Sequence, residues 1–337
     1  MQLGFSVATR SGLGPTEIAA LALTAERAGF DAYFVAERVA DSLSLCHSAL
    51  AATHSITVGT AIANARLRHP ALMAMTAATI DESGGGRFML GLGSSNAHLN
   101  EAVLRLAPVR PVPFMRDYVG QLRCALACGP KSQADAAPID EVQFDRPAGR
   151  RTMRIVLGAL LPSMLRLAGE IADGVVLNLT TPTLLPSILR SVADGAAISG
   201  RRLQDLVVAC VMPCSVDGDD EVARRAGQDL IVGYAQHPAA ARVFTASAYS
   251  RELQEIAERL SAGDRAGALR MVSDEMIDEF LLHGDARACR ERIARYREAG
   301  VVLPILFPIA AGGHWTATLN KTIAFAAEKL IQPVSLT

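Results

Sequence analysis

Residues 59–101, GTAIANARLRHPALMAMTAATIDESGGGRFMLGLGSSNAHLNE, decide the fold, because they contain a strand, a loop, a helix, a turn and a second strand. The β-branched run Ile56–Ala63 predicts a strand that is buried on both faces. A helix over Pro70–Glu82 begins with a proline, which has no N–H to leave unpaired, and ends at the glycine-rich turn Ser83–Gly86. Arg87–Gly93 is the next strand, and its glycines allow backbone or ligand to come close.

The same alternation of strand and helix continues through the rest of the chain. Further strands are predicted over Leu3–Ala8, Asp31–Glu37, Met153–Leu160, Gly174–Leu179, Leu206–Pro213 and Val301–Pro308. Helices are predicted over Pro15–Ala28, Ser42–Thr53, Phe114–Cys128, Pro162–Ala172, Thr183–Ile198, Asp285–Ala299 and His314–Leu330. Two further segments complete the chain. Residues Gly129–Arg151 are predicted to form a loop or short hairpin, and residues 219–282 a long helical region that is broken near His237-Pro238 and Gly263.

Eight strands that alternate with helices predict an α/β fold, a single (β/α)8 TIM barrel over residues 1–337. The competing architecture is an open doubly wound sheet, which places a G-x-G-x-x-G motif after its first strand. The sequence there, FSVATRSGLG, lacks that motif, and the G-x-G of Gly91–Gly93 follows the fourth strand without a third glycine. We therefore favour the barrel.

The composition argues against nucleic-acid and membrane partners. The 337 residues carry a net charge of −1, which provides no basic surface for nucleic acid or anionic lipid. No apolar run reaches membrane-spanning length and no signal segment is visible at the N-terminus, so we expect a cytoplasmic protein. The six cysteines form no C-x-x-C pair and have no nearby histidine partner, which predicts reduced thiols and no metal site.

Polar residues follow several of the predicted strands. The loops Asn64–His69 and Ser94–Glu101 each follow a strand, as do Glu37, Arg38 and Asn178. Because the loops after the strands of a β/α barrel gather on one face, we expect these two loops to lie together on the catalytic face. In the first loop, His69 precedes Pro70, and we expect it to order the start of the following helix.

Four segments together resemble a known family. They are AERAGFDAYFVAER, the strand–helix–strand stretch that ends in RFMLGLG, SMLRLAGEIADGVVLN, and FLLHGDARACRERIARYREAGVVLPILFP. The R-H-P and S-x-G-R-F-x-L-G-x-G motifs are specific in combination, and the chain resembles the luciferase-like monooxygenase superfamily. That family contains flavin-dependent monooxygenases and deazaflavin-dependent reductases or dehydrogenases. The resemblance implies a barrel with a helical insertion after strand seven, at about 219–282, and FMN or coenzyme F420 across the C-terminal mouth.

The resemblance also implies where the cofactor lies. It places a non-proline cis peptide at Ala61–Ile62, in the strand that faces the flavin ring. Asn64 either binds the pyrimidine edge of the ring or forms a turn. The turn Gly158–Met164 matches the family's phosphate site at a helix N-terminus, although Leu161 replaces its usual glycine. The residues expected to bind the cofactor are Ser6, Ala61, Ile62, Asn64, Gly93, Ser94, Asn100, Gly158, Ala159, Pro162, Ser163 and Asn178.

Three residues are candidates for catalysis. Glu37 and Arg38 stand where deazaflavin-dependent relatives commonly have an acid followed by histidine, the candidate proton donor. Arginine stays protonated and is a poor general acid, so Arg38 either binds an anionic group or pairs with Glu37 or Asp41. Glu101 follows Asn100 where sugar-phosphate-oxidising relatives carry the same pair. Glu101 either transfers a proton beneath an apolar ring or stands in the first turn of a helix capped by Asn100.

The sequence therefore predicts an oxidoreductase in which reduced coenzyme F420 transfers a hydride to a C=C or C=N bond of a small molecule. The Asn100-Glu101 pair favours this reading, as does the arginine-rich, lysine-poor composition, which is typical of a GC-rich genome. The alternatives are an FMN-dependent monooxygenase and a non-catalytic barrel that binds a flavin or pterin. We expect His98 and Trp315 to shape the substrate pocket.

The early helices predict a homodimer, because they carry apolar residues on more than one face. These helix segments are Ala19–Ala28, Ala49–Thr53 and Ala71–Ala78.

Overall fold

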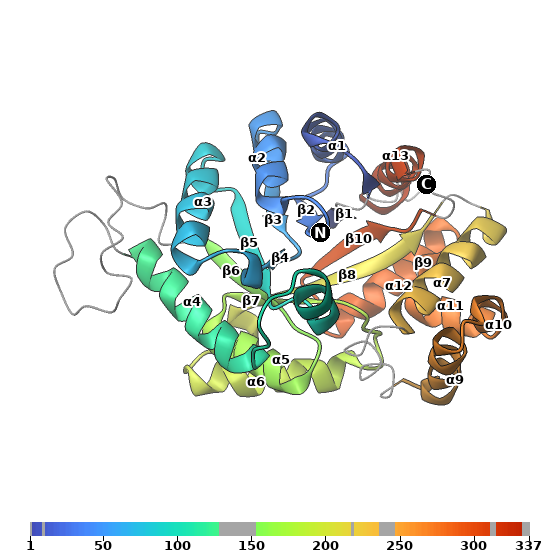
Figure 1. Cartoon of the computed structure of the whole chain (residues 1–337). Coiled ribbons are helices and arrows are strands. Elements are labelled where there is room, and N and C mark those ends of the chain that lie inside the picture. The colour runs from blue at the N-terminus through green and yellow to red at the C-terminus, as the bar shows by residue number, and fades with distance from the viewer. Residues whose placement is uncertain are drawn as a thin grey trace.

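A closed parallel sheet forms the centre of the molecule (Figure 1). The structure is a computed structural model that describes residues 2–8, 11–127, 153–216, 219–235, 247–310 and 315–331. Each barrel strand pairs in parallel with the next, and β10 pairs with both β8 and β1, so the sheet closes. The predicted TIM barrel is confirmed. Its strands are β1 (Gly4–Ala8), β2 (Ala32–Ala36), β3 (Thr57–Thr60), β5 (Phe88–Gly93), β6 (Arg154–Gly158), β7 (Gly174–Leu177), β8 (Val207–Ser215) and β10 (Leu303–Pro308).

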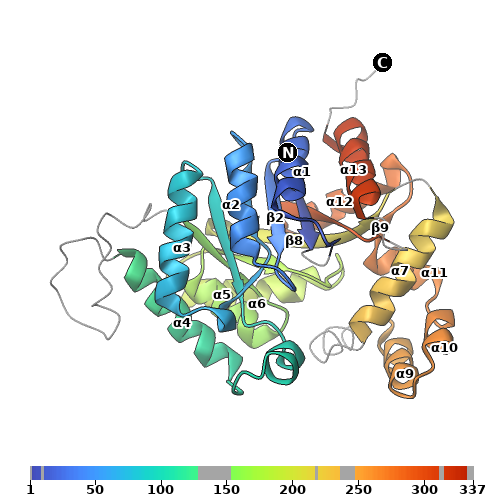
Figure 2. The same ribbon diagram turned by 45° about the horizontal axis from the view of Figure 1, so that its top comes forward.

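Helices surround the barrel (Figure 2). They are α1 (Pro15–Arg27), α2 (Ser42–Ala52), α3 (Pro70–Ser83), α4 (Pro111–Ala127), α5 (Pro162–Ile171), α6 (Leu185–Ile198), α12 (Ala286–Glu298) and α13 (Trp315–Ala326). The expected insertion follows β8 and contains α7 (Asp220–Ala235), α9 (Ser250–Ser261), α10 (Arg265–Arg270) and α11 (Asp274–Phe280). Figure 1 shows these four helices together on the side of the barrel away from α3 and α4. The predicted segment Gly129–Arg151 and the break at His237-Pro238 lie outside the described residues.

Two apolar layers and a separate cluster make up the core. Successive strand residues point to opposite faces, so alternate side chains fill the barrel and the others pack against the helices. The interior contains Ala32, Phe34, Met89, Val156, Val176, Ala209, Val211, Leu303 and Ile305. The insertion has its own cluster, which includes Leu230, Ile256 and Ile277. Leu179 and Ile309, which follow β7 and β10, belong to that cluster and attach the insertion to one end of the barrel.

Several predicted elements differ from the structure in their bounds or in their loops. The third strand is divided into β3 and the two-residue β4 (Ala63–Asn64), which pairs with β5. α4 begins at Pro111, three residues before the predicted start at Phe114, because the first turn of a helix needs no N–H from its prolines. The two polar loops contain short helices, a 3₁₀ turn η2 (Ala65–Leu67) and a π-helix η3 (His98–Val103). A further two-residue strand, β9 (Leu282–His283), pairs with β8.

Candidate functional site

The segment Ala61–Asn64 directly follows β3 at the C-terminal ends of the strands and includes β4. Its Ala61–Ile62 peptide bond is cis, as the resemblance implied. The Ala61 N–H donates to the carbonyl of Val35 at 3.1 Å, and the Glu37 N–H donates to the carbonyl of Ile62 at 3.2 Å. The segment is therefore attached to the end of β2 on both sides of Ile62.

Two glycines make room for the side chain of Ile62, and a third makes room for the backbone of Thr60 before it. A Cβ added at Gly93 would lie 2.8 Å from Ile62 Cδ1, and one added at Gly158 would lie 3.0 Å from Ile62 Cγ2. A Cβ at Gly91 would lie 1.9 Å from the carbonyl oxygen of Thr60 and 3.6 Å from Ile62 Cγ2. Only glycine allows this approach of β5 and β6 to the segment. Sequence reasoning did not include Gly91 in the site, although its alternation with Gly93 places both glycines on one face of the strand.

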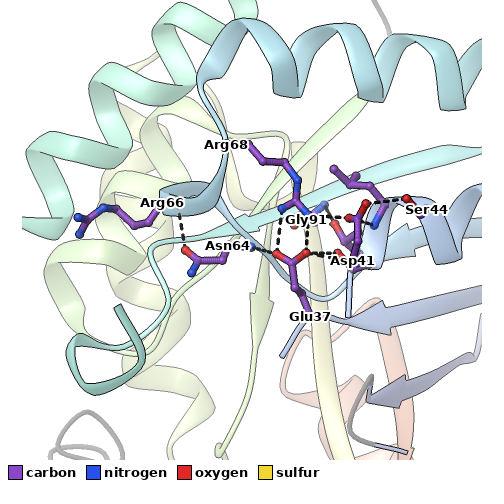
Figure 3. Close-up of polar contacts among 10 residues, drawn as sticks. Glu37, Asp41, Ser44, Asn64, Arg66, Arg68 and Gly91 are labelled. Atoms are coloured by element: carbon purple, nitrogen blue, oxygen red, sulfur yellow. Dashed lines mark hydrogen bonds and ion pairs between the residues drawn. The ribbon is translucent and has the colours of Figure 1, made fainter. Parts of the chain in front are cut away.

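A buried ion pair lies beside this segment (Figure 3). Arg68 donates from Nη2 to Glu37 Oε1 at 2.7 Å and from Nη1 to Glu37 Oε2 at 3.1 Å. Nη2 also donates to Asp41 Oδ1 at 2.6 Å. The side chains of Arg68 and Glu37 are only 14% and 5% exposed, so water screens their pairing little. Sequence reasoning missed Arg68; the R-H-P motif contained it, but no role was assigned to it.

The charges of this cluster shift two pKa values. Burial acts to lower the pKa of Arg68, but the hydrogen bond and charge of Glu37 and the charge of Asp41 outweigh it and raise that pKa. Burial acts to raise the pKa of Asp41, but the hydrogen bond from Ser44 and the charge of Arg68 outweigh it and lower that pKa. The contacts between Arg68 and Asp41 therefore favour the charged forms of these two side chains.

Two asparagines join the two polar loops. Asn64 Nδ2 donates to Asn100 Oδ1 at 2.9 Å, and Asn100 Nδ2 donates to the carbonyl of Ser94 at 2.7 Å. The prediction that these loops lie together is confirmed. Asn64 Oδ1 accepts the Arg66 N–H at 3.0 Å, so Asn64 also forms the turn that the sequence left open. The cap of the η3 segment is Asn96, whose Oδ1 accepts the Leu99 N–H at 2.8 Å, and not Asn100.

The other candidate residues lie at the rim or below it. Arg38, Glu101 and His98 are exposed, and Trp315 is half-buried at the start of α13. His69 Nδ1 accepts the Ala71 N–H at 3.3 Å and caps α3, as predicted.

The expected phosphate turn is present at the start of α5. Pro162 is the first helical residue, Leu161 precedes it, and no side chain caps the helix. Ser163 is exposed in the first turn, whereas Ala159 is buried. The N-terminus of a helix with uncapped N–H groups attracts anions, so the turn suits a phosphate group.

Asn178 connects the barrel to the insertion. Its Nδ2 donates to the hydroxyl of Tyr234 in α7 at 3.1 Å, and its Oδ1 accepts the Leu179 N–H at 2.9 Å. These contacts fit a supporting role at the rim of the barrel.

Ser6 provides a test of whether a cofactor fits. Its side chain is 1% exposed, and its Oγ has no hydrogen-bond partner among the described residues. Burying a hydroxyl without a partner is unfavourable. Ser6 pairs in register with Phe34, which lines the barrel interior, so the hydroxyl belongs to the inner face. An unpaired inner hydroxyl, an anion-binding helix end and a glycine-lined mouth together fit a phosphorylated flavin-type group.

A cavity of about 510 Å³ opens between the Asn64–His69 loop and α4. It is lined by Ala65, Arg66, Leu67, Arg68, His69, Pro70, Phe114, Asp117, Tyr118 and Gln121.

Within the described ranges, no group of three or more histidine, cysteine, aspartate or glutamate side chains could hold a metal ion. No helix in the described part of the chain is long and apolar enough to cross a membrane.

Comparisons with known proteins agree with this arrangement. The model of a family described as luciferase-like monooxygenase matches residues 1–303. A 5,10-methylenetetrahydromethanopterin reductase from Methanolobus tindarius is 28% identical over 320 residues, which are 94% of this chain and 95% of the relative. An F420-dependent glucose-6-phosphate dehydrogenase from Nakamurella multipartita is 33% identical over 248 residues, 66% of this chain and 69% of the relative. The solved coenzyme F420-dependent tetrahydromethanopterin reductase from Methanopyrus kandleri matches the fold with a TM-score of 0.79 at 23% identity, covering 98% of both chains.

Proposed function

The chain belongs to the luciferase-like monooxygenase family, and on that basis we propose that it is a coenzyme F420-dependent oxidoreductase. In this proposal the residues at the mouth of the barrel, Ile62 among them, would hold the reduced deazaflavin. The bound coenzyme would supply the hydride for reduction of a C=C or C=N bond of a small-molecule substrate. The names of the reductase and dehydrogenase relatives support F420 as the cofactor.

The observation that carries the proposal is the glycine-lined seat of Ile62. Gly93 and Gly158 come from neighbouring strands and leave space where any other residue would meet Ile62. The two glycines therefore determine how closely the Ala61–Asn64 segment packs against β5 and β6. The segment lies at the end of the barrel where β/α enzymes bind their substrates. The unpaired Ser6 hydroxyl on the inner face supports the same location.

The residues of the chain would divide the work as follows. Coenzyme F420 supplies the hydride carrier. The N-terminus of α5, with Gly158, Ala159, Pro162 and Ser163, binds its phosphate group. Ser6 donates a hydrogen bond to the ring system or its side chain. Glu101 holds the proton that accompanies hydride transfer, and Arg38 binds an anionic group of the substrate or cofactor.

Titration of the purified protein with coenzyme F420 and with FMN tests the proposal. We expect a change in the absorbance spectrum with F420 and no consumption of oxygen when the reduced complex meets air. Tight binding of FMN with oxygen-dependent turnover would instead identify a monooxygenase. Binding of either cofactor without turnover of any C=C or C=N compound would identify a non-catalytic barrel.

We also propose that the protein is a cytoplasmic homodimer with one domain over residues 1–337. Leu72 and Met75 on α3 are 51% and 46% exposed, and Leu67 nearby is 44% exposed. Large apolar side chains gathered on one helix face are typical of subunit contacts. Light scattering at micromolar concentration should give twice the mass of the chain; a monomer mass would contradict the dimer.

A further inference from the structure

Glu37 has no free hydrogen-bonding capacity in this structure. Its Oε1 accepts from the Ser42 N–H and hydroxyl, each at 3.3 Å, and from Arg68 at 2.7 Å. Its Oε2 accepts from the Asn64 N–H at 2.7 Å and from Arg68 at 3.1 Å. A carboxylate offers about four lone-pair positions, and all are in use here. The side chain is 5% exposed, so it is also withdrawn from solvent and substrate.

The same residue holds the Ala61–Asn64 segment at two points. Its backbone N–H donates to the carbonyl of Ile62, and its carboxylate accepts the N–H of Asn64. Asn64 in turn donates to Asn100, which donates to the carbonyl of Ser94. An unbroken series of hydrogen bonds thus runs from Glu37 through both polar loops.

Arg68 closes the first loop on itself. The loop begins where the Asn64 N–H meets Glu37 and ends where the Arg68 guanidinium meets the same carboxylate (Figure 3). The carbonyl of Arg68 also accepts the hydroxyl of Tyr118 on α4 at 2.9 Å. The loop is therefore fixed at both ends to Glu37, the residue that follows β2, and to Tyr118 of α4.

We propose that Glu37 and Arg68 are positioning residues for the cofactor, which set the place of Ile62, Asn64 and Asn100 without taking part in proton transfer. This role rests on the proposed function in so far as the positioned residues contact a flavin-type ring. It differs from the role that the sequence suggested for Glu37, that of a catalytic residue. The donors that surround the Glu37 carboxylate all belong to the chain itself, so they leave no oxygen position open to substrate or cofactor.

The test is Glu37→Gln in the full chain, measured first without cofactor. Gln keeps the size of the side chain but loses the charge and the two-point contact with Arg68. Hydrogen exchange of the amides in 61–68 and 94–100 should become about tenfold faster or more. Kd for coenzyme F420 and for FMN should rise about tenfold, while kcat at saturating cofactor stays within about threefold of wild type. A catalytic acid would show the opposite, an unchanged Kd and a kcat lowered roughly 10²–10⁴-fold.

Glu170→Gln is the matched control. Glu170 also forms a two-point pair, with Arg116 at 2.5 Å for each contact, but this pair joins α5 to α4. Its loss should change neither the exchange of 61–68 nor Kd. If Glu37→Gln does not fold, Arg68→Lys retains the positive charge without the two-point contact and should change the same amides in the same direction.

The outcomes separate this inference from the proposed function. Unchanged exchange in both Glu37→Gln and Arg68→Lys would overturn the positioning role even if the wild-type protein binds F420. If the wild-type protein binds neither F420 nor FMN, the proposed function falls, and the exchange data alone then decide whether Glu37 holds the two loops.

Discussion

The side-chain nitrogen of Asn64 lies 2.9 Å from Oδ1 of Asn100, a residue 36 positions later in the chain. Both side chains are 3% exposed. The contact exists because β4 and β5 are paired, which brings the loops after them to the same edge of the sheet. Both ends of the Asn100 amide are engaged, because Oδ1 accepts from Asn64 and Nδ2 donates to the carbonyl of Ser94.

Asn100→Asp should therefore destabilise the protein. Asp keeps the acceptor for Asn64 but places a carboxylate oxygen against the carbonyl of Ser94, where an N–H donor is needed. We expect a loss of about 1–3 kcal/mol in the free energy of unfolding. Asn96→Asp is the control, because the Asn96 side chain accepts the Leu99 N–H through its oxygen, and aspartate caps helices equally well. Equal denaturation midpoints for the two variants would contradict the assigned orientation of Asn100.

Glu101→Gln tests proton transfer at the rim of the site. Gln retains the size and hydrogen bonding of the side chain but cannot exchange a proton. If Glu101 supplies the proton, turnover should fall roughly 10²–10⁴-fold with cofactor affinity unchanged. Steady-state kinetics with the true substrate measure this, and a wild-type rate would show that the proton comes from elsewhere. Because Glu101 is exposed, the melting temperature should not change.

Arg38→Ala should act on binding and not on the chemical step. Arg38 is exposed just after β2, and its planar guanidinium, with several N–H donors, suits it to an anionic group. Loss of one charge-assisted hydrogen bond should weaken binding by about 1.5–3 kcal/mol. A raised KM or Kd with kcat retained is the expected pattern. A drop in kcat alone would assign Arg38 to the reaction itself.

Gly91→Ala and Gly120→Ala should have opposite effects on stability. The new Cβ at position 91 would lie 1.9 Å from the backbone oxygen of Thr60, so β3 and β5 would have to move apart. We expect a loss of about 1–3 kcal/mol. Gly120 lies inside α4 with nothing within 4 Å of an added Cβ, so alanine there should stabilise by about 0.4–1 kcal/mol. Urea denaturation of both variants provides the comparison.

Glu26 should make stability depend on pH in acid. Its carboxylate accepts the N–H groups of His54, Ser55 and Ile56. Burial acts to raise the pKa of Glu26, but these backbone hydrogen bonds outweigh it and lower the pKa from 4.5 to about 2. The folded state therefore favours the ionised form. Its contribution to stability is complete above about pH 4.5 and is lost as the pH falls towards 2.

The comparison of wild type with Glu26→Gln isolates this contribution from other carboxylates. The variant should melt at a lower temperature than wild type at pH 7, and the difference should shrink as the pH falls from about 4.5 to 2. A difference that stays constant over that range would show that the carboxylate charge of Glu26 is not what stabilises the His54–Ile56 turn.

Local patterns in the sequence were sufficient for the barrel and for most of its elements. Apolar runs and their spacing identify strands and helices because burial on one or both faces requires them. Pro70 and Pro162 mark helix starts correctly, since a missing N–H costs nothing in the first turn. The same rule explains why α4 starts at Pro111, three residues before the predicted start at Phe114. The family resemblance located the cis bond at Ala61–Ile62.

The partners of the polar residues were decided only by the tertiary structure. Arg68, 31 residues further along the chain than Glu37, binds the Glu37 carboxylate at two points, and no local pattern in the sequence indicates this contact. Asn100 resembled a helix cap, but Asn96 performs that role and Asn100 meets Asn64. Hydrophobic periodicity reports on neighbours within one strand or helix. A charged or amide side chain instead forms hydrogen bonds with donors and acceptors within about 3 Å, which can come from distant parts of the chain. Which groups lie that close depends on the pairing of all eight barrel strands.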